Sequence, residues 1–301
     1  MRHLFTIVIL FILVLLCGAL LSFPVYKVLQ PVTDIAFHKL ISYTSTLCGL
    51  LLLGLWLRHE NRLSLETVGF IKSAPATTVA QMFTGFIAGI IIIVILTTAL
   101  LLLGIHQIEP DITFNPAAGG RIIMSALFAG AMVGIIEETL YRGVLFGGLL
   151  TRIRAPGTIL LSSIIYSGVH FLKFGGVSAD LPITWFSGVQ LLPGAFYQFT
   201  DPAIIDAFLS LFAFGVLLAM VRLKSGTLYQ CMGLHAGVVA TLKIVNKTTD
   251  YVPHNNLAFL VNKYDHQLGY LALSWLAVCI LVYYRTAFAG ARTSRFITIS
   301  D

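Results

Sequence analysis

Long apolar stretches recur along the whole chain and constrain its fold more strongly than any other feature. A helix that crosses the hydrocarbon core of a bilayer needs roughly 17–25 apolar residues, and these stretches reach that length. Hydrophobic residues make up 57% of the sequence and charged residues 11%, whereas an ordinary soluble domain has about 25% charged residues. So few charges would not cover the surface of a soluble fold. The sequence therefore predicts a single integral membrane domain over residues 1–301.

The apolar stretches predict an all-α, polytopic transmembrane bundle of about eight spans. The first stretch follows the basic start Met1-Arg2-His3 and is too long for the apolar core of a signal peptide, so it is predicted to be the first transmembrane helix. The predicted spans are, in chain order, Leu4–Ser22, Leu40–Leu57, Val79–Leu103, Arg121–Leu150, Thr158–Phe171, Ala203–Val221, Thr227–Lys243 and Leu268–Tyr284.

The charged residues near the ends of the predicted spans alternate as the positive-inside rule describes, which predicts that both termini are cytoplasmic. The basic side holds Arg2, Arg58, Arg62, Lys72, Arg152, Arg154, Arg222, Lys224, Arg285, Arg292 and Arg295; the other side holds Lys27, Asp34, Glu109, Asp111, Lys173, Asp180, Asp201, Lys247, Asp250, Lys263 and Asp265. The formal net charge of +6 is thus explained by orientation in the lipid bilayer. Nucleic acid is not an expected partner, because the basic residues form no stripe.

The connection from Phe174 to Pro202 is long and rich in aromatic residues. Because aromatic side chains favour the bilayer interface, we expect a loop that lies along the outer leaflet, anchored by its aromatic rings. A gate or substrate-entry element is the alternative. The aromatic residues concerned are Trp185, Phe186, Phe196, Tyr197 and Phe199.

A short list of ionisable side chains interrupts the predicted spans: Glu137, Glu138, Arg142, His170, His235 and, nearer a helix end, Lys243. Each such residue at the centre of an apolar helix costs at least about 2.5 kcal/mol on insertion scales, so each needs a functional or structural reason. Packing through an acid–base cluster and satisfied core histidines are the structural alternatives to a catalytic site.

The two adjacent glutamates have different expected partners. Glu138 and Arg142 are four residues apart on one helix face, with the acid first, which is the favourable order for an ion pair. Glu137 is rotated by about 100° from Glu138 and has no cation three or four residues away. Its partner is therefore expected from another helix, and a carboxylate without a fixed cation is suited to general-base chemistry on water.

Helical rise places both histidines at depths compatible with Glu137. Counted from the predicted cytoplasmic ends of their spans, Glu137 lies about 20 Å deep, His170 about 18 Å and His235 about 12 Å. These three side chains on three helices are predicted to surround one polar cavity that opens toward the cytoplasm.

Three short motifs resemble those of the CPBP family, the CAAX prenyl endopeptidase and bacteriocin-processing membrane proteins, also called the Abi family. Glu137-Glu138-x-x-Tyr141-Arg142 is similar to the family's E-E-x-x-x-R motif, and Tyr166-Ser-Gly-Val-His170 resembles F-x-x-x-H with Tyr in place of Phe. Gly233-Leu-His235-Ala-Gly resembles the third motif, which usually continues to H-x-x-x-N. The resemblance covers the fourth to seventh predicted spans, a family-like catalytic core of about residues 119–246.

The resemblance implies an intramembrane glutamic-type endopeptidase that needs no cofactor. Glu137 would activate water, His170 would help to hold it, and His235 would polarise the scissile carbonyl and stabilise the oxyanion. Glu138, Arg142, Tyr141 and Tyr166 would support these groups. The chain departs from the family at Val239, which stands where the family has Asn and cannot donate a hydrogen bond. Lys243, two helical turns after His235, either supplies the missing positive charge or extends to the membrane interface.

Other protease chemistries have weaker sequence support. The chain has no G-x-S-G, G-x-G-D or H-E-x-x-H motif. A three-ligand zinc site of Glu137, His170 and His235 is conceivable, but no closely spaced ligands favour it, so the metal-free reading is preferred.

The leading function is hydrolysis of a peptide bond in a membrane-tethered peptide or protein, and the resemblance implies a bacterial inner membrane. One alternative is a non-catalytic peptide-binding or immunity membrane protein, which Val239 favours. Another is a proton-coupled transporter, because Glu and His residues also mark proton paths. The sequence shows no repeated half that would support the transporter.

Overall fold

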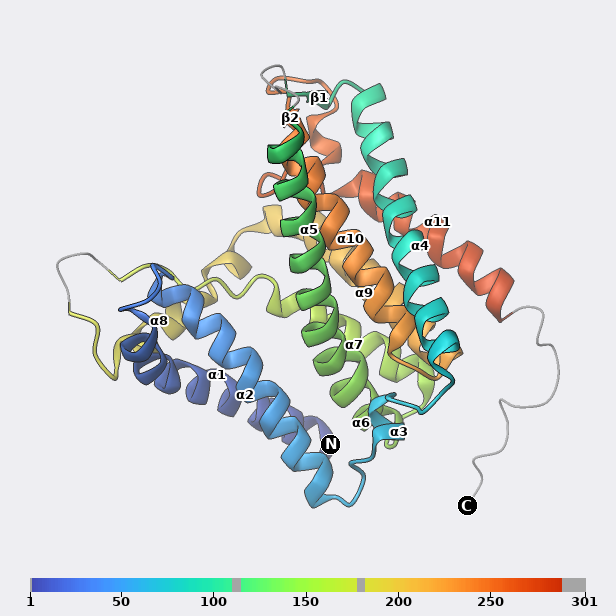
Figure 1. Ribbon diagram of the computed structural model, residues 1–301. Helices are drawn as coiled ribbons and strands as arrows, with labels where there is room; N and C mark the ends of the chain where they lie inside the picture. The colour runs from blue at the N-terminus through green and yellow to red at the C-terminus, as the bar shows by residue number, and fades with distance from the viewer. Residues whose placement is uncertain (1, 110–114, 178–181, 289–301) are drawn as a thin grey trace.

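The computed structural model of the chain describes residues 2–109, 115–177 and 182–288 and is built almost wholly from helices (Figure 1). The charges predicted at Asp111, Asp180, Arg292 and Arg295 lie outside the described residues, as does the side chain of Arg2. The predicted all-α membrane bundle is confirmed.

Each predicted span coincides with a helix. The elements are α1 (Arg2–Leu29), α2 (Phe37–His59), α3 (Leu65–Val68), α4 (Pro75–Leu102), β1 (His106–Ile108), α5 (Pro116–Glu138), the π-helix η1 (Thr139–Leu145), α6 (Phe146–Leu150), α7 (Ala155–Val169), α8 (Ser187–Ala195), the 3₁₀ helices η2 (Tyr197–Thr200) and η3 (Pro202–Ile204), α9 (Ile205–Ser225), α10 (Tyr229–Thr248), β2 (Thr249–Tyr251), the 3₁₀ helix η4 (Ala258–Leu260) and α11 (Tyr270–Ala287). The antiparallel pair β1–β2 is the small exception to an all-α fold.

In the described part of the chain, six helical segments are long and apolar enough to cross a membrane: Val8–Leu29, Phe37–His59, Pro75–Leu102, Pro116–Leu150, Pro202–Ser225 and Tyr270–Ala287. The remaining two predicted spans are α7, which has 15 residues, and α10, which carries His235, Lys243 and Lys247. Helix α7 is shorter than the about 20 residues that a span usually needs. Helix α10 packs against α4 and α5, which shield much of its surface. The count of eight and the cytoplasmic termini therefore stay predictions.

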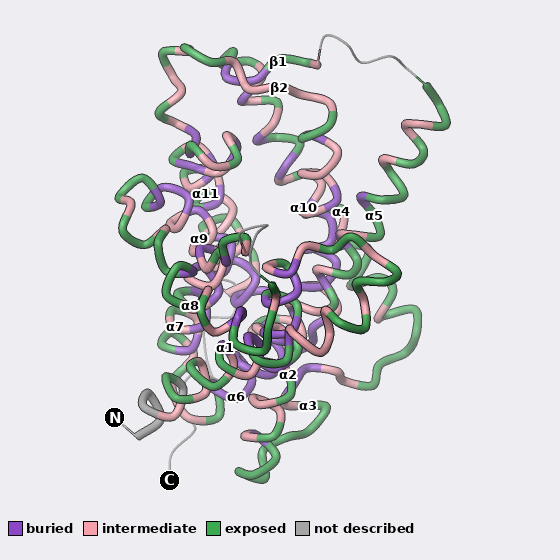
Figure 2. Tube along the Cα trace, turned by 90° about the vertical axis from the view of Figure 1, so that its left-hand side faces the viewer, coloured by how far each residue is buried: buried purple, intermediate pink, exposed green. Residues whose placement is uncertain are grey.

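Helix α10 lies between α4 and α5, and half of its residues are buried (Figures 1 and 2). Small residues allow this close approach. A Cβ atom added to Gly233 of α10 would lie 2.0 Å from the carbonyl oxygen of Met82 on α4, and one added to Gly134 of α5 would lie 2.7 Å from that of Met232 on α10. Close backbone packing at small residues is a common way for membrane helices to associate. It fixes the depth and rotation of His235.

The antiparallel helices α1 and α2 form a hairpin at the side of this bundle (Figure 1). Helix α8 packs across α1, where a Cβ atom on Gly188 would lie 2.2 Å from the carbonyl oxygen of Ala19. Helix α2 reaches the bundle at η1. The predicted loop from Phe174 to Pro202 thus contains a helix that sequence reasoning missed, while Trp185 and Phe186 beside it are exposed as expected of interface anchors.

Helices α3 and α6 and the strand pair β1–β2 lie at opposite ends of the bundle (Figure 1). At one end, which we call the basic end, Arg62 donates to the carbonyl oxygen of Thr151 at 2.8 Å and Arg152 pairs with Glu60 at 3.2 Å. At the other end β1 pairs with β2 in the register His106 to Tyr251. Lys263 also hydrogen-bonds Asp201 there and holds the pKa of that carboxyl below its usual range.

Candidate functional site

The site begins where α5 changes into a π-helix. Glu137 and Glu138 are the last residues of α5, and the π-helix η1 follows directly over Thr139–Leu145. A π-helical turn is wide and its hydrogen bonds are poorly aligned, so proteins keep such turns mainly at functional positions. The sequence did not predict this π-helix, because no short residue pattern indicates that a helical turn will form i→i+5 hydrogen bonds.

Glu138 belongs to a buried polar triad. Its carboxylate lies 3.4 Å from the Arg142 guanidinium, the pair expected from their spacing, and its Oε1 accepts a hydrogen bond of 2.8 Å from His235 Nδ1. The three side chains are 0%, 1% and 4% exposed. His235 was predicted to face Glu137 in a common cavity, and that prediction is wrong. The rotation of α10 against α5 brings its ring to the neighbouring glutamate.

Tyr166 connects the triad to the second histidine. The Arg142 guanidinium lies over the Tyr166 ring at 4.1 Å, and the rings of His170 and His235 lie 4.6 and 6.2 Å from it. Tyr141 contacts the same ring edge-on at 5.3 Å. An aromatic face attracts a cation and favours edge-on neighbours. The aromatic rings therefore fix the mutual placement of the charged and imidazole groups.

Glu137 faces His170, as the sequence predicted for a partner from another helix. His170 Nε2 lies 3.9 Å from Glu137 Oε2, and the two side chains are 30% and 26% exposed. His170 caps the end of α7 and was predicted to lie within it. Its Nδ1 contacts the carbonyl oxygen of Tyr166 at 2.7 Å. Because a carbonyl only accepts, Nδ1 carries the proton, and a neutral His170 presents the lone pair of Nε2 toward Glu137.

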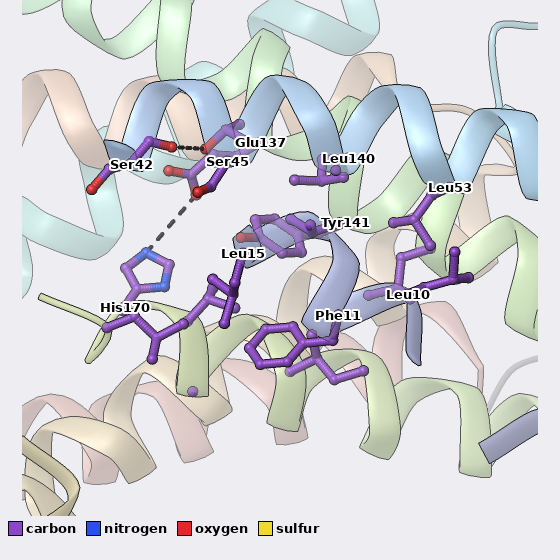
Figure 3. Close-up of a pocket in the computed structure, with 18 of the residues that line it drawn as sticks. Leu10, Phe11, Leu15, Ser42, Ser45, Leu53, Glu137, Leu140, Tyr141 and His170 are labelled. Carbon is purple, nitrogen blue, oxygen red and sulfur yellow. Dashed lines mark hydrogen bonds and ion pairs between the residues drawn. The ribbon is translucent and has the colours of Figure 1, made fainter. Parts of the chain in front are cut away.

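A large apolar cavity opens at this pair. It has a volume of about 620 Å³ and lies between the α1–α2 hairpin, η1 and α7. Figure 3 shows Glu137 and His170 facing each other across it, with Ser42 and Ser45 of α2 beside Glu137 and with Leu10, Phe11 and Leu15 of α1 along its wall. Phe174, Phe196 and Phe199 also line it. We call it the substrate cavity.

Two buried oxygen atoms at this cavity lack a hydrogen-bond partner within the described part of the protein. These atoms are Glu137 Oε2 and Ser45 Oγ. Buried polar atoms without a partner are rare and call for an explanation. A water molecule or a substrate group that hydrogen-bonds there would satisfy both.

Lys243 lies away from the pair and the triad. Its ammonium donates to the hydroxyl of Ser125 on α5 at 2.8 Å and to the carbonyl oxygen of the same residue at 3.2 Å. Of the two roles expected for Lys243, supply of positive charge to the site and extension to the membrane interface, the first is not seen, because the ammonium is bound to α5. Val239 lines a second, smaller cavity together with His235.

Glu137, His170 and His235, the three residues considered as zinc ligands, do not point toward one common point. Glu137 pairs with His170 and Glu138 with His235, and no group of three or more His, Cys, Asp and Glu side chains in the described ranges is placed to hold a metal ion. Catalytic zinc takes three protein ligands at about 2 Å. The metal-free mechanism stays a prediction.

Residues 119–241 match the family model described as type II CAAX prenyl endopeptidase Rce1-like. They form an Rce1-like domain. The resemblance seen in the three motifs is confirmed, and this domain contains the triad, Tyr166 and the Glu137–His170 pair. Comparisons with curated proteins and with solved structures found no match. The family that residues 119–241 match is one of endopeptidases, and the apolar helices along the chain make it an integral membrane protein.

Arg222 is a residue of the Rce1-like domain that sequence reasoning placed among the basic loop charges. The structure buries it at 6% exposure, and no ion pair joins it to a described carboxylate. It donates instead to the carbonyl oxygens of Arg142 in η1 at 3.3 Å, Thr67 in α3 at 3.2 Å and Gly226 at 2.6 Å. Arg222 thus ties α3 and the end of α9 to the π-helix.

Replacing Arg222 by Met is expected to lower the free energy of unfolding by about 2–3 kcal/mol, because hydrogen bonds from a charged group contribute about 1.5–3 kcal/mol and buried carbonyls would lose their donor. Denaturation of the purified protein in detergent measures the loss. Lys224→Met is the matched control, since Lys224 is exposed on the same turn, and it should change stability by less than about 0.5 kcal/mol. Equal effects of the two substitutions would contradict this role for Arg222.

Proposed function

We propose that the chain is an intramembrane endopeptidase of the glutamic type, with Glu137 as the general base. The observation that carries the proposal is the orphaned Oε2 of Glu137, which faces His170 Nε2 at 3.9 Å at the polar end of an otherwise apolar cavity. That separation is too long for a direct hydrogen bond. It suits one water molecule that contacts both groups.

The proposed reaction begins with the water bound between Glu137 and His170. Glu137 accepts a proton from the water as its oxygen attacks the carbonyl carbon of the scissile peptide, which forms a tetrahedral oxyanion. The C–N bond then breaks, and Glu137 returns the proton to the leaving amine nitrogen. The products are a carboxylic acid and an amine, and the enzyme is regenerated.

His235 is proposed to stabilise the oxyanion. Its Nδ1–H donates a hydrogen bond to Glu138. Its Nε2 can therefore donate a second hydrogen bond only when the ring carries both protons. Arg142 and Tyr166 hold the Glu138 carboxylate and the His235 ring in place. Glu138, Arg142, Tyr141 and Tyr166 thus act as supporting residues.

The substrate is proposed to be a membrane-tethered peptide or protein segment. The cavity walls are mostly apolar, and the polar exceptions are Glu137, His170, Tyr141, Ser42, Ser45 and Thr46. A water-soluble peptide would lose its hydration there without gaining hydrogen bonds. A segment that carries an apolar anchor would be partitioned into the bilayer beside the cavity.

Hydrolysis is tested by incubating proteoliposomes with a library of lipid-anchored peptides in ¹⁸O-labelled water. Mass spectrometry should find cleaved peptides with one ¹⁸O atom in the new carboxyl group, which shows attack by water. The Glu137→Gln protein, assayed in parallel, should yield none. Cleavage that is equal in both proteins would overturn the proposal.

Val239 favours a second candidate function, a non-catalytic membrane protein that binds an apolar peptide. Valine supplies no donor where the family has Asn. This function predicts that the Glu137→Gln protein captures the same peptides as the wild type and that neither protein cleaves them.

Val239→Asn is expected to raise kcat by about 10²–10³-fold, the usual effect of one oxyanion donor. Val239 follows His235 by one helical turn on α10 and lines the same cavity, so an amide there would reach the same oxyanion. Steady-state kinetics with one cleaved peptide checks this expectation. An unchanged or lower kcat in a folded variant would show that the oxyanion lies elsewhere.

A further inference from the structure

Helices α5 and α10 pack in an antiparallel register that can be followed toward the β1–β2 end of the bundle (Figure 1). A Cβ atom added to Gly130 of α5 would lie 2.5 Å from the carbonyl oxygen of Ala236 on α10. Nearer the β1–β2 end, Lys243 of α10 donates to the hydroxyl of Ser125 on α5 at 2.8 Å. A later residue of α10 thus meets an earlier residue of α5.

Two further cations lie one helical turn beyond this contact. Arg121 precedes Ser125 by four residues on α5, and Lys247 follows Lys243 by four residues on α10. Residues four apart share one face of a helix. Because the two helices run in opposite directions, Arg121 and Lys247 reach the same height in the bundle. We call Arg121, Lys243 and Lys247 the cation cluster.

The cation cluster has no acidic partner within the described ranges. The ion pairs of the structure join other residues, and none of them includes Arg121, Lys243 or Lys247. Arg121 and Lys247 are exposed. Like charges one turn apart on a helix repel each other. An anion from outside the chain would remove this repulsion.

The donors of the cluster suit a phosphate group. A guanidinium presents two parallel N–H groups to phosphate oxygens, and an ammonium presents three donors. The Ser125 hydroxyl accepts from Lys243, so its own proton is left to donate to a second acceptor. Basic sites between membrane helices bind lipid head groups in the same way.

An apolar row on α5 begins next to the cluster. Met124, Phe128 and Met132 follow one another by one helical turn and are 67%, 69% and 42% exposed. Lys243 lies about 7.5 Å from the end of α10 at Thr248, and a lysine at that depth extends its ammonium to the membrane interface. A phosphate held there would place an attached acyl chain along the apolar row, which a free phosphate ion would leave uncovered.

We propose that the cation cluster and the Ser125 hydroxyl bind the phosphate group of an acidic phospholipid, whose acyl chain covers the apolar row of α5. None of these residues lines the substrate cavity. The site is therefore separate from the proposed peptide hydrolysis, and it holds for either candidate function.

The site is tested in mixed micelles that contain equal amounts of acidic phosphatidylglycerol and zwitterionic phosphatidylcholine. Native mass spectrometry should find phosphatidylglycerol bound to the wild type in preference to phosphatidylcholine by at least about 10-fold, because each nearby cation contributes about 5-fold to binding of an acidic lipid. Arg121→Gln, Lys243→Met and Lys247→Gln should each lower this ratio by about 5-fold. Lys243→Arg, which keeps the charge, should retain it.

Lys39→Met is the matched control. Lys39 is an exposed lysine near the start of α2, so its replacement changes the net charge by the same amount and should leave the lipid ratio as in the wild type. Thermal unfolding gives a second readout. Added phosphatidylglycerol should raise the unfolding temperature of the wild type and of Lys39→Met more than that of Arg121→Gln, because a ligand stabilises the folded state that binds it.

Three results would overturn the proposal. The first is equal binding of the two lipids by the wild type. The second is an unchanged lipid ratio in folded Arg121→Gln and Lys247→Gln proteins, whose exposed side chains can be replaced without disturbing the core. The third is displacement of phosphatidylglycerol by inorganic phosphate, which would show a site for a soluble anion. Retention of the lipid in excess inorganic phosphate supports a phospholipid site.

Discussion

Glu137→Gln is expected to lower kcat for peptide cleavage by about 10²–10⁴-fold, the range that general-base catalysis contributes. Glutamine has nearly the same shape as glutamate but cannot take a proton from water. Because Glu137 forms no ion pair with another described residue beyond the long contact to His170, its replacement should leave the fold intact. Single-turnover cleavage of one anchored peptide in proteoliposomes, together with a thermal unfolding curve, separates the two effects.

Two further variants show whether the loss is specific to Glu137. Glu66→Gln changes an exposed glutamate of α3 and should leave both the rate and the unfolding temperature as in the wild type. Glu138→Gln removes the charge that pairs with Arg142 and should lower stability as well as activity. A Glu137→Gln protein that retains more than about a tenth of the wild-type kcat would argue against a general base at this position.

Arg142→Met is expected to lower the free energy of unfolding by about 3–5 kcal/mol, the usual cost of removing one partner of a buried ion pair. The side chains of Arg142 and Glu138 are 1% and 0% exposed, so the remaining carboxylate would have no water to replace the guanidinium. The Tyr166 ring would also lose the cation above it. Reversible denaturation in mixed micelles measures the change.

Arg152→Met is the comparison that isolates the burial of the partner. Arg152 also lies over an aromatic ring, that of Trp56 at 4.1 Å, and also pairs with a carboxylate, that of Glu60 at 3.2 Å. Glu60 is 39% exposed, however, and water can solvate it after the change. A loss of about 1 kcal/mol is expected, in line with ordinary surface pairs. Similar losses at both positions would contradict a special role for the buried triad.

Local sequence rules predicted the helices and the Glu138–Arg142 pair, because hydropathy and an i,i+4 spacing act within one helix. They did not predict which glutamate His235 would meet. Depth estimates along helices leave the rotation of α10 open, and that rotation is set by glycine contacts with α4 and α5. The π-helix after Glu138 was missed for a similar reason, since its wide turn is held by tertiary contacts such as that from Arg222.

The polar helix α10 shows why hydropathy alone miscounts spans. Its residues His235 and Lys243 are held by α5, through Glu138 and Ser125, so they need not face lipid. Helix α8 shows the opposite case. Its short apolar stretch sits within a loop rich in Gly and Pro, and only its contact with α1 reveals it as a packed helix.

The α1–α2 hairpin has a consequence for how the cavity could change in evolution. Helix α1 packs chiefly on α2 and α8, and α2 meets the Rce1-like domain mainly at η1. The hairpin supplies one wall of the substrate cavity but no member of the buried triad. Substitutions on α1 can therefore reshape the chamber for a new substrate while the reacting groups keep their positions. Changes in the α1 wall of the cavity thus fall in a different stretch of the chain from Glu137, His170 and the buried triad.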